Sequence, residues 1–115
     1  MLIASDETKL FPIENLRDGC GVTNFNLYCD TTNAPKNTRL ITEISLEPGC
    51  SIGKHTHQSE TELYYVVRGI GELDDNGEAR MVRARDLSYC NEGHYHAIKN
   101  TGTDTLLLLA IVVTE

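Results

Sequence analysis

The sequence contains few basic residues, no long apolar run and no sustained helical period, and each shortage excludes a class of protein. Its 115 residues include 10 lysines and arginines against 17 aspartates and glutamates, a net charge of −7. Nucleic acids and anionic membrane surfaces attract basic patches, so we expect neither as a partner. The longest apolar run, Leu106 to Val113, is too short to span a bilayer. No stretch has the pattern of a DNA-binding helix-turn-helix.

The chain also lacks the sequence signs of export. Its first residues contain neither a basic segment nor an apolar core of signal-peptide length, so we expect a cytoplasmic protein. None of the four cysteines belongs to a C-x-x-C pair, and free thiols are therefore expected. Cys90 is the cysteine nearest to the cluster of histidines described below, and it is predicted to be a small buried side chain.

What is present is typical of one soluble globular domain. Hydrophobic residues make up 40% of the chain and charged residues 23%, which is an ordinary composition for a folded protein. Residues 1–20 have no regular pattern, and we interpret them as an N-terminal arm that packs on a barrel or on a partner subunit. Residues 21–115 are predicted to form the β-barrel domain.

Short alternating segments separated by turn residues predict an all-β fold, either a barrel or a double-sheet jelly roll. Asn76-Gly77, between apolar flanks, is a strong signal for a tight hairpin turn. The last segment, 105–114, is apolar on both faces, so a strand there needs cover on the side away from the core. The N-terminal arm or a second copy of the chain would provide that cover, which favours a homodimer. The expected strands include residues 22–29, 39–46, 63–67, 79–83, 86–90 and 105–114.

A cluster of potential metal ligands lies between Gly49 and Gly69. In a strand, His55 and His57 would project from the same face because they are two residues apart. Glu62 follows a short polar turn, and we interpret the two segments as a hairpin that returns Glu62 to the histidines. His96 in a later alternating segment is a candidate fourth ligand. Imidazole and carboxylate ligands suit first-row ions such as Mn, Fe, Co, Ni, Cu or Zn.

These residues resemble the two motifs of the cupin family. The first motif, G-x5-H-x-H-x3,4-E-x6-G, is matched in full by Gly49, His55, His57, Glu62 and Gly69. The resemblance implies the cupin double-stranded β-helix, a jelly-roll barrel, with one divalent transition-metal ion (Mn, Fe, Zn or Ni) held by the three histidines and Glu62.

The second cupin motif, G-x5-P-x-G-x2-H-x3-N, is matched in part. Gly93, His96 and Asn100 agree with it, while Arg85 stands where the first glycine belongs and Asn91 where the proline does. Both departures fall at turns and not at ligands. They concern the shape of the loop before His96 more than metal binding.

The proposed ligand set favours an enzyme. Four protein ligands leave an octahedral ion two open positions for substrate or dioxygen. Two further residues are candidate catalytic groups. Tyr64 shares the strand face of Glu62, and this arrangement resembles that of some cupin lyases, which use a tyrosine placed similarly after the glutamate ligand. The alternative is that Tyr64 is an aromatic side chain that only lines the cavity. His94 is two residues before His96 and would project from the same face of a strand. The alternative is that His94 is a solvated histidine of the loop.

Small cupins of this kind resemble decarboxylases, dioxygenases, lyases and isomerases that act on a compact carboxylate or diol. In oxalate decarboxylases an arginine three residues before the first histidine binds the substrate, and Ile52 occupies that position here. This departure counts against oxalate. The alternative function is a non-catalytic module that binds a small ligand or a metal ion.

Overall fold

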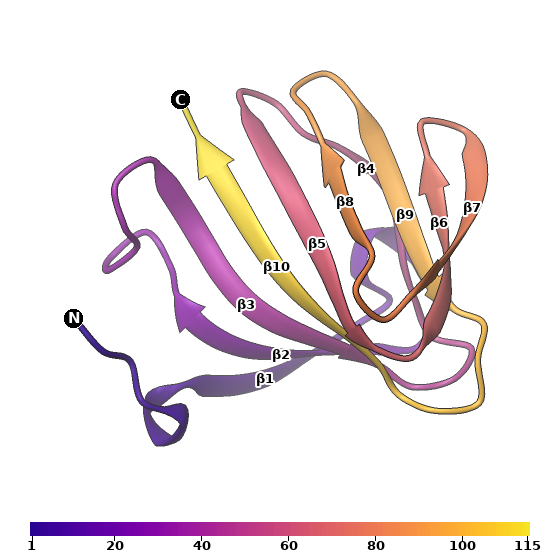
Figure 1. Ribbon diagram of the computed structural model, residues 1–115, viewed down its shortest axis with the longest axis horizontal. Helices are drawn as coiled ribbons and strands as arrows, with labels where there is room; N and C mark the ends of the chain where they lie inside the picture. The colour runs from indigo at the N-terminus through magenta and orange to yellow at the C-terminus, as the bar shows by residue number, and fades with distance from the viewer.

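A computed structural model describes residues 1–115 and contains two antiparallel sheets that face each other (Figure 1). The larger sheet has the strand order β1-β2-β3-β10-β5-β8, and the smaller has the order β4-β9-β6-β7. The all-β jelly-roll barrel predicted from the sequence is confirmed. The elements are η1 (Ser5–Glu7), β1 (Lys9–Glu14), η2 (Leu16–Asp18), β2 (Val22–Cys29), β3 (Thr38–Leu46), β4 (Ser51–Thr56), β5 (Glu60–Arg68), β6 (Ile70–Asp75), β7 (Glu78–Arg83), β8 (Leu87–Cys90), β9 (Tyr95–Asn100) and β10 (Leu106–Thr114).

The core lies between the two sheets and is formed by alternate residues of each strand. Leu106, Leu108, Ala110 and Val112 of β10 are fully buried, while the residues between them are more exposed. The predicted ligands His55, His57, Glu62 and His96 are buried as well. Neither short helix is long and apolar enough to cross a membrane.

The turn at Asn76-Gly77 joins β6 and β7, as the sequence predicted. Both residues have positive φ, 53° and 91°, the combination that a two-residue hairpin with the right-handed strand twist requires. Asp75 pairs with Glu78 across this turn. The hairpin extends the four-stranded sheet to its edge at β7.

The predicted hairpin between the histidine segment and the Glu62 segment is wrong. β4 pairs with β9 in the smaller sheet, whereas β5 pairs with β10 and β8 in the larger one. The chain therefore crosses from one sheet to the other between Thr56 and Glu60. His57 and Glu62 meet because the two sheets face each other and not because their strands are neighbours.

The segment before residue 20 contains ordered structure. β1 pairs along its whole length with β2 and extends the larger sheet at its edge. After it, η2 packs against β4, where Gly19 and Gly53 allow the two backbones to approach closely. The division into an arm of residues 1–20 and a barrel of residues 21–115 stays a prediction.

Arg85 takes over the conformation of the glycine that the second motif has at this position. Its φ is 78°, in the left-handed region, and its amide donates a hydrogen bond to the Val66 carbonyl oxygen at 2.8 Å. Gly93, which the motif retains, has φ 80°. The departure at Arg85 therefore leaves the turn intact and places a non-glycine residue in a disfavoured backbone region.

Candidate metal centre

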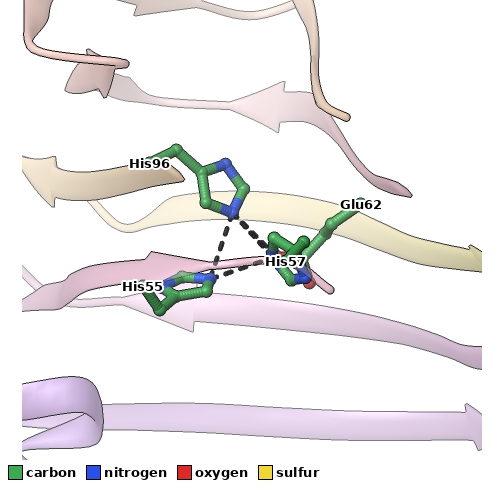
Figure 2. A group of neighbouring side chains, drawn as sticks. All are labelled: His55, His57, Glu62 and His96. Atoms are coloured by element: carbon green, nitrogen blue, oxygen red, sulfur yellow. Dashed lines mark hydrogen bonds and ion pairs between the residues drawn. The ribbon is translucent and has the colours of Figure 1, made fainter. Parts of the chain in front are cut away.

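His55, His57, Glu62 and His96 converge in one end of the barrel (Figure 2). His55 comes from β4, His96 from β9 beside it, and Glu62 from β5 on the opposite sheet, while His57 follows the end of β4. All four are buried, with 9%, 5%, 6% and 2% of the surface of His55, His57, Glu62 and His96 exposed. The structure thus brings together all four residues proposed from the sequence.

A β-bulge in β4 aims the two histidines inward. Ile52 pairs with Ile98 and His55 with His96, so β4 has three steps where β9 has two. Simple alternation from the buried Ile52 would place His55 on the outer face. The extra residue at Gly53-Lys54 reverses that parity, and both His55 and His57 then face the interior.

The distances within the cluster fit a single metal ion. Glu62 Oε1 lies 3.4 Å from His55 Nε2, 3.0 Å from His57 Nε2 and 2.9 Å from His96 Nε2. The His96 Nε2 atom is 3.1 Å from each of the other two Nε2 atoms. Ligand atoms about 2.1 Å from an ion and at right angles to one another would be about 3.0 Å apart, so the donor atoms have the spacing that coordination requires.

The hydrogen bonds of Nδ1 in His55 and His57 show that Nε2 is the ring nitrogen available to bind a metal ion. His55 Nδ1 donates to the Gly53 carbonyl oxygen at 2.8 Å, and His57 Nδ1 donates to Glu60 Oε2 at 2.8 Å. In the neutral imidazole the proton on Nδ1 leaves a lone pair on Nε2, which points into the cluster. Inward-facing lone pairs and a carboxylate repel one another unless a cation lies between them. The cluster could therefore hold a divalent ion.

The close contacts within the cluster also shift the pKa values of its side chains when no metal is considered. Burial opposes the charged form of Glu62, but contacts with His55, His57 and His96 outweigh it and hold its pKa below the ordinary value. Burial lowers the pKa of His96. Burial also acts to lower the pKa of His57, yet Glu62 and Glu60 raise it on balance. A negative charge is thus retained at the centre of the cluster.

Tyr64 contacts the cluster through its ring. The ring stacks on His96 with 4.7 Å between centroids and 10° between planes, and the side chain is 2% exposed. Burial, and then the charge of Glu62, raise the pKa of its hydroxyl well above the usual value. The catalytic role predicted for Tyr64 stays a prediction, but its position against the His96 ring is clear.

His94 lies outside the four-residue cluster, in the turn before β9. Its backbone carbonyl accepts a hydrogen bond from the His57 amide at 3.1 Å, which ties this turn to the cluster. The side chain lines a cavity of about 500 Å³ between the β6–β7 hairpin and β8. Asp75 lines the same cavity and pairs with His96 in the register of β6 and β9, but none of the four cluster residues lines the cavity. The catalytic role of His94 stays a prediction.

Cys90 lies beside the cluster on β8, opposite Glu62 in the strand register. It is 2% exposed, and all four cysteines are free. Burial, then the charges of Glu62 and Asp75, raise the pKa of its thiol to about 11. These properties agree with the small buried side chain predicted from the sequence.

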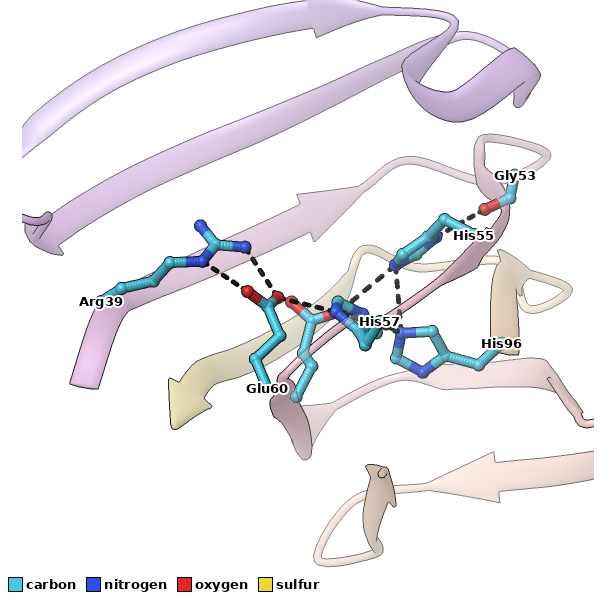
Figure 3. A network of polar contacts seen from close by, with 7 residues as sticks. Arg39, Gly53, His55, His57, Glu60 and His96 are labelled. Atoms are coloured by element: carbon cyan, nitrogen blue, oxygen red, sulfur yellow. Dashed lines mark hydrogen bonds and ion pairs between the residues drawn. The ribbon is translucent and has the colours of Figure 1, made fainter. Parts of the chain in front are cut away.

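Sequence reasoning missed two residues that contact the cluster from outside. Glu60, a charged residue at the start of β5, accepts the hydrogen bond from His57 and also receives two from Arg39 (Figure 3). The spacing of Glu60 three residues after His57 was a usable signal, because a tight turn brings such residues together. Arg39 is 21 positions away on another strand, and its place in the sequence does not separate a residue at the barrel mouth from a surface residue.

Comparisons with known proteins identify relatives over most of the chain. The cupin domain family matches residues 42–112. The oxalate-binding protein of Thermotoga maritima is 33% identical over 113 residues, which cover 98% of this chain and 93% of that protein. The 5-nitrosalicylic acid 1,2-dioxygenase of Bradyrhizobium sp. is 35% identical over 66 residues, 57% of this chain and 31% of that enzyme.

Solved structures agree with the sequence matches. The crystal structure of a predicted oxalate decarboxylase from Thermotoga maritima has a TM-score of 0.93 and 32% identity, with both chains covered completely. KdgF from Halomonas sp. has a TM-score of 0.77 at 16% identity and supports the fold alone. Because the family match spans more than half of the chain and the Thermotoga relatives span nearly all of it, this protein belongs to the cupin family.

Proposed function

We propose that this protein is a metal-dependent enzyme that binds a compact carboxylate of the oxalate class beside an ion held by His55, His57, Glu62 and His96. The observation that carries the proposal is the convergence of these four donor atoms within 4.8 Å of one another. A divalent ion bound there would supply positive charge that holds a carboxylate and stabilises a developing anion. The oxalate-binding relative, which spans nearly the whole chain, supports this substrate class.

The cavity beside the cluster is our proposed entry for the substrate. Its charged lining side chains include Asp75 and Asp86 but only one arginine, Arg80. Two aspartates repel a dicarboxylate, so the attraction must come from the metal site and Arg80. Arg80 would then take the place of the substrate-binding arginine for which this chain has the buried Ile52.

Tyr64 and His94 would have different tasks in this enzyme. Tyr64 packs flat on His96, so it would keep that imidazole oriented and present its hydroxyl inside the barrel. His94 is exposed and lines the cavity, so it would carry a proton between the substrate and solvent. Replacing Tyr64 by Phe separates the hydroxyl from the ring, because the ring contact with His96 survives.

A binding protein without catalysis is the second candidate. The Thermotoga relative is named for binding oxalate and not for converting it, which favours this alternative specifically. The dioxygenase relative matches only 57% of this chain. Binding and catalysis share the same metal site, and they differ in whether bound substrate is converted.

The first test is elemental analysis of protein purified without a metal-affinity tag, beside the variants His57→Ala and His94→Ala. We expect near-stoichiometric transition metal in the wild type and in His94→Ala, and its loss in His57→Ala. Calorimetry should then show oxalate binding to the metal-loaded wild type, weakened by Arg80→Gln, and a gas-release assay should detect turnover. Absence of metal from all three proteins, with no uptake of added Mn²⁺, Fe²⁺ or Zn²⁺, would overturn the proposal; binding without turnover would establish the second candidate.

A further inference from the structure

We propose that Glu60 and Arg39 are positioning residues of the metal centre: Glu60 fixes the His57 imidazole, and Arg39 fixes Glu60. The inference rests on the proposed metal site and adds the residues that hold its ligand from outside. The contacts run from Arg39 on β3 through Glu60 to Nδ1 of His57 (Figure 3).

The first contact joins the ligand to a carboxylate. Glu60 Oε2 accepts a hydrogen bond from His57 Nδ1 at 2.8 Å, and its side chain is only 14% exposed. Ser59, with φ 58°, makes the tight turn that returns Glu60 to His57 three residues earlier. A carboxylate on Nδ1 fixes the tautomer with Nε2 free and increases the donor strength of that nitrogen.

The three histidines are not equivalent in this respect. His55 donates through Nδ1 to the neutral carbonyl oxygen of Gly53, whereas His57 donates to a charged group. His57 should therefore be the stronger nitrogen donor of the two. Loss of the Glu60 charge would lower the strength of one particular ligand while all four remain in place.

The second contact holds the carboxylate itself. Arg39 Nε and Nη2 donate to Glu60 Oε1 and Oε2, both at 2.8 Å, in a two-pronged pair. Such a pair fixes the plane of the carboxylate as well as its distance, which a lysine cannot do. Glu60 Oε2 thus receives one hydrogen bond from Arg39 and another from His57.

A β-bulge explains how Arg39 reaches Glu60. In the pairing of β3 with β10, Leu40 is opposite Val112 and Thr38 is opposite Val113, so Arg39 has no partner residue. Regular alternation would place Arg39 on the outer face with Ile41. The bulge redirects its side chain across the end of β10 to β5, and bulges beside functional sites commonly redirect a side chain in this way.

The test measures Co²⁺ affinity by competition with a chelator, together with the visible absorption bands of bound Co²⁺, which respond to the ligand field. Glu60→Gln keeps the size of the side chain and removes its charge, and we expect affinity to fall about 10- to 100-fold, with shifted bands. Glu92→Gln is the matched control, because Glu92 is an exposed residue of the nearby β8–β9 turn. It should bind Co²⁺ as the wild type does.

Arg39→Lys conserves the charge and removes only the two-pronged geometry. As a single change, we expect Arg39→Lys to weaken Co²⁺ binding by a smaller factor than Glu60→Gln does. Added to Glu60→Gln it should have no further effect, since Arg39 acts through Glu60. Unchanged affinity and bands in Glu60→Gln, or additive losses in the double variant, would overturn the inference while leaving the metal site intact. Failure of the wild type itself to bind Co²⁺ would instead overturn the proposed function and this inference with it.

Discussion

Asn100 is a buried side chain whose hydrogen bonds join three backbone segments. Its Nδ2 donates to the carbonyl oxygens of Leu46 and Asp104 at 2.7 and 2.8 Å, and its Oδ1 accepts from the Gly102 amide at 2.9 Å. Asn100→Ala leaves these groups without partners, and we expect the free energy of unfolding to fall by roughly 1–3 kcal/mol. Urea denaturation measures this change.

The control for Asn100 is Asn24, an exposed asparagine on β2. Asn24→Ala should change the free energy of unfolding by less than about 0.5 kcal/mol. Metal content should be unchanged in both variants, because Asn100 is at the opposite end of β9 from His96. Equal stability of the two variants would show that the hydrogen bonds of Asn100 contribute nothing to the turn.

Arg85 has a disfavoured backbone conformation that glycine adopts freely. With φ at 78° the arginine carries steric strain, while glycine would add flexibility to the unfolded chain. The strain is the larger effect by a small margin, so Arg85→Gly should raise the free energy of unfolding by up to about 1 kcal/mol. Arg85→Ala retains the strain, so its free energy of unfolding should not rise. If Arg85→Ala raised the free energy of unfolding as much as Arg85→Gly, the arginine side chain and not the backbone strain would cause the effect.

For single residues, spacing predicted which four side chains would come together, but it did not predict the residues that support them. His55 and His57 could be assigned because ligand types at short fixed intervals are rare by chance, and Glu62 and His96 followed from the motifs. Glu60 was not among the candidates, since a charged residue in a turn is usually solvated. Its burial depends on Arg39, and a contact between distant strands leaves no trace in local sequence.

The bulge in β4 turns His55 and His57 of the candidate metal centre toward the interior. A Cβ on Gly53 would overlap the Arg17 carbonyl oxygen of η2, and the Gly53 carbonyl oxygen also accepts the His55 hydrogen bond. Gly53→Ala should therefore displace η2 or straighten the bulge, lowering the free energy of unfolding by about 1–3 kcal/mol and weakening metal binding. Thermal denaturation and Co²⁺ titration measure the two effects.

Gly102→Ala is the matched control for Gly53→Ala. A Cβ at Gly102 would make only ordinary contacts, the shortest at 3.4 Å. This variant should retain wild-type metal affinity. If Gly53→Ala also bound Co²⁺ with wild-type affinity, the bulge would not be needed to aim His55.

At the element scale, the strands were predictable and two of their irregularities were not. The expected strand at 22–29 agrees with β2, whereas the two apolar faces of β10 could not be told apart from the sequence and only the structure shows which one is buried. Alternation shows which side chains share a face, but it does not show which strand lies alongside, so the β4–β5 hairpin was wrongly predicted. The bulges at Gly53-Lys54 and Arg39 depend on the register with β9 and β10, which only the assembled sheets define.

Across the whole fold, the candidate metal centre joins the two sheets. His55 and His96 belong to the smaller sheet and Glu62 to the larger one, so an ion bound to all of them resists separation of the sheets. At a free metal concentration about 100 times Kd, binding should add about 2.7 kcal/mol to the free energy of unfolding and raise Tm by roughly 10 °C. Differential scanning calorimetry of the wild type with Mn²⁺ tests this; His57→Ala should show a much smaller rise, and an equal rise would place the ion elsewhere.

The outer face of the larger sheet is apolar where β5 and β10 lie side by side. Leu109 pairs with Tyr65 and Ile111 with Leu63 across these strands, and Tyr65, Val67 and Val113 are 39%, 43% and 38% exposed. The sequence left two candidates to cover this face, the N-terminal arm and a second subunit. β1 lies at the edge of the sheet beside β2 and does not cross the face, as Figure 1 shows. A second copy of the chain is the remaining candidate.

We therefore expect a homodimer that packs through β5 and β10, because two such faces would bury each other's apolar side chains. Light scattering should give about twice the 12.8 kDa chain mass. Leu109→Glu puts a charge at the centre of the interface and should yield a folded monomer, verified by circular dichroism. Ile70→Glu, an equivalent change at an exposed position on the smaller sheet, should remain dimeric. A wild-type mass equal to one chain would contradict the dimer, and dissociation by Ile70→Glu alone would move the interface to the other sheet.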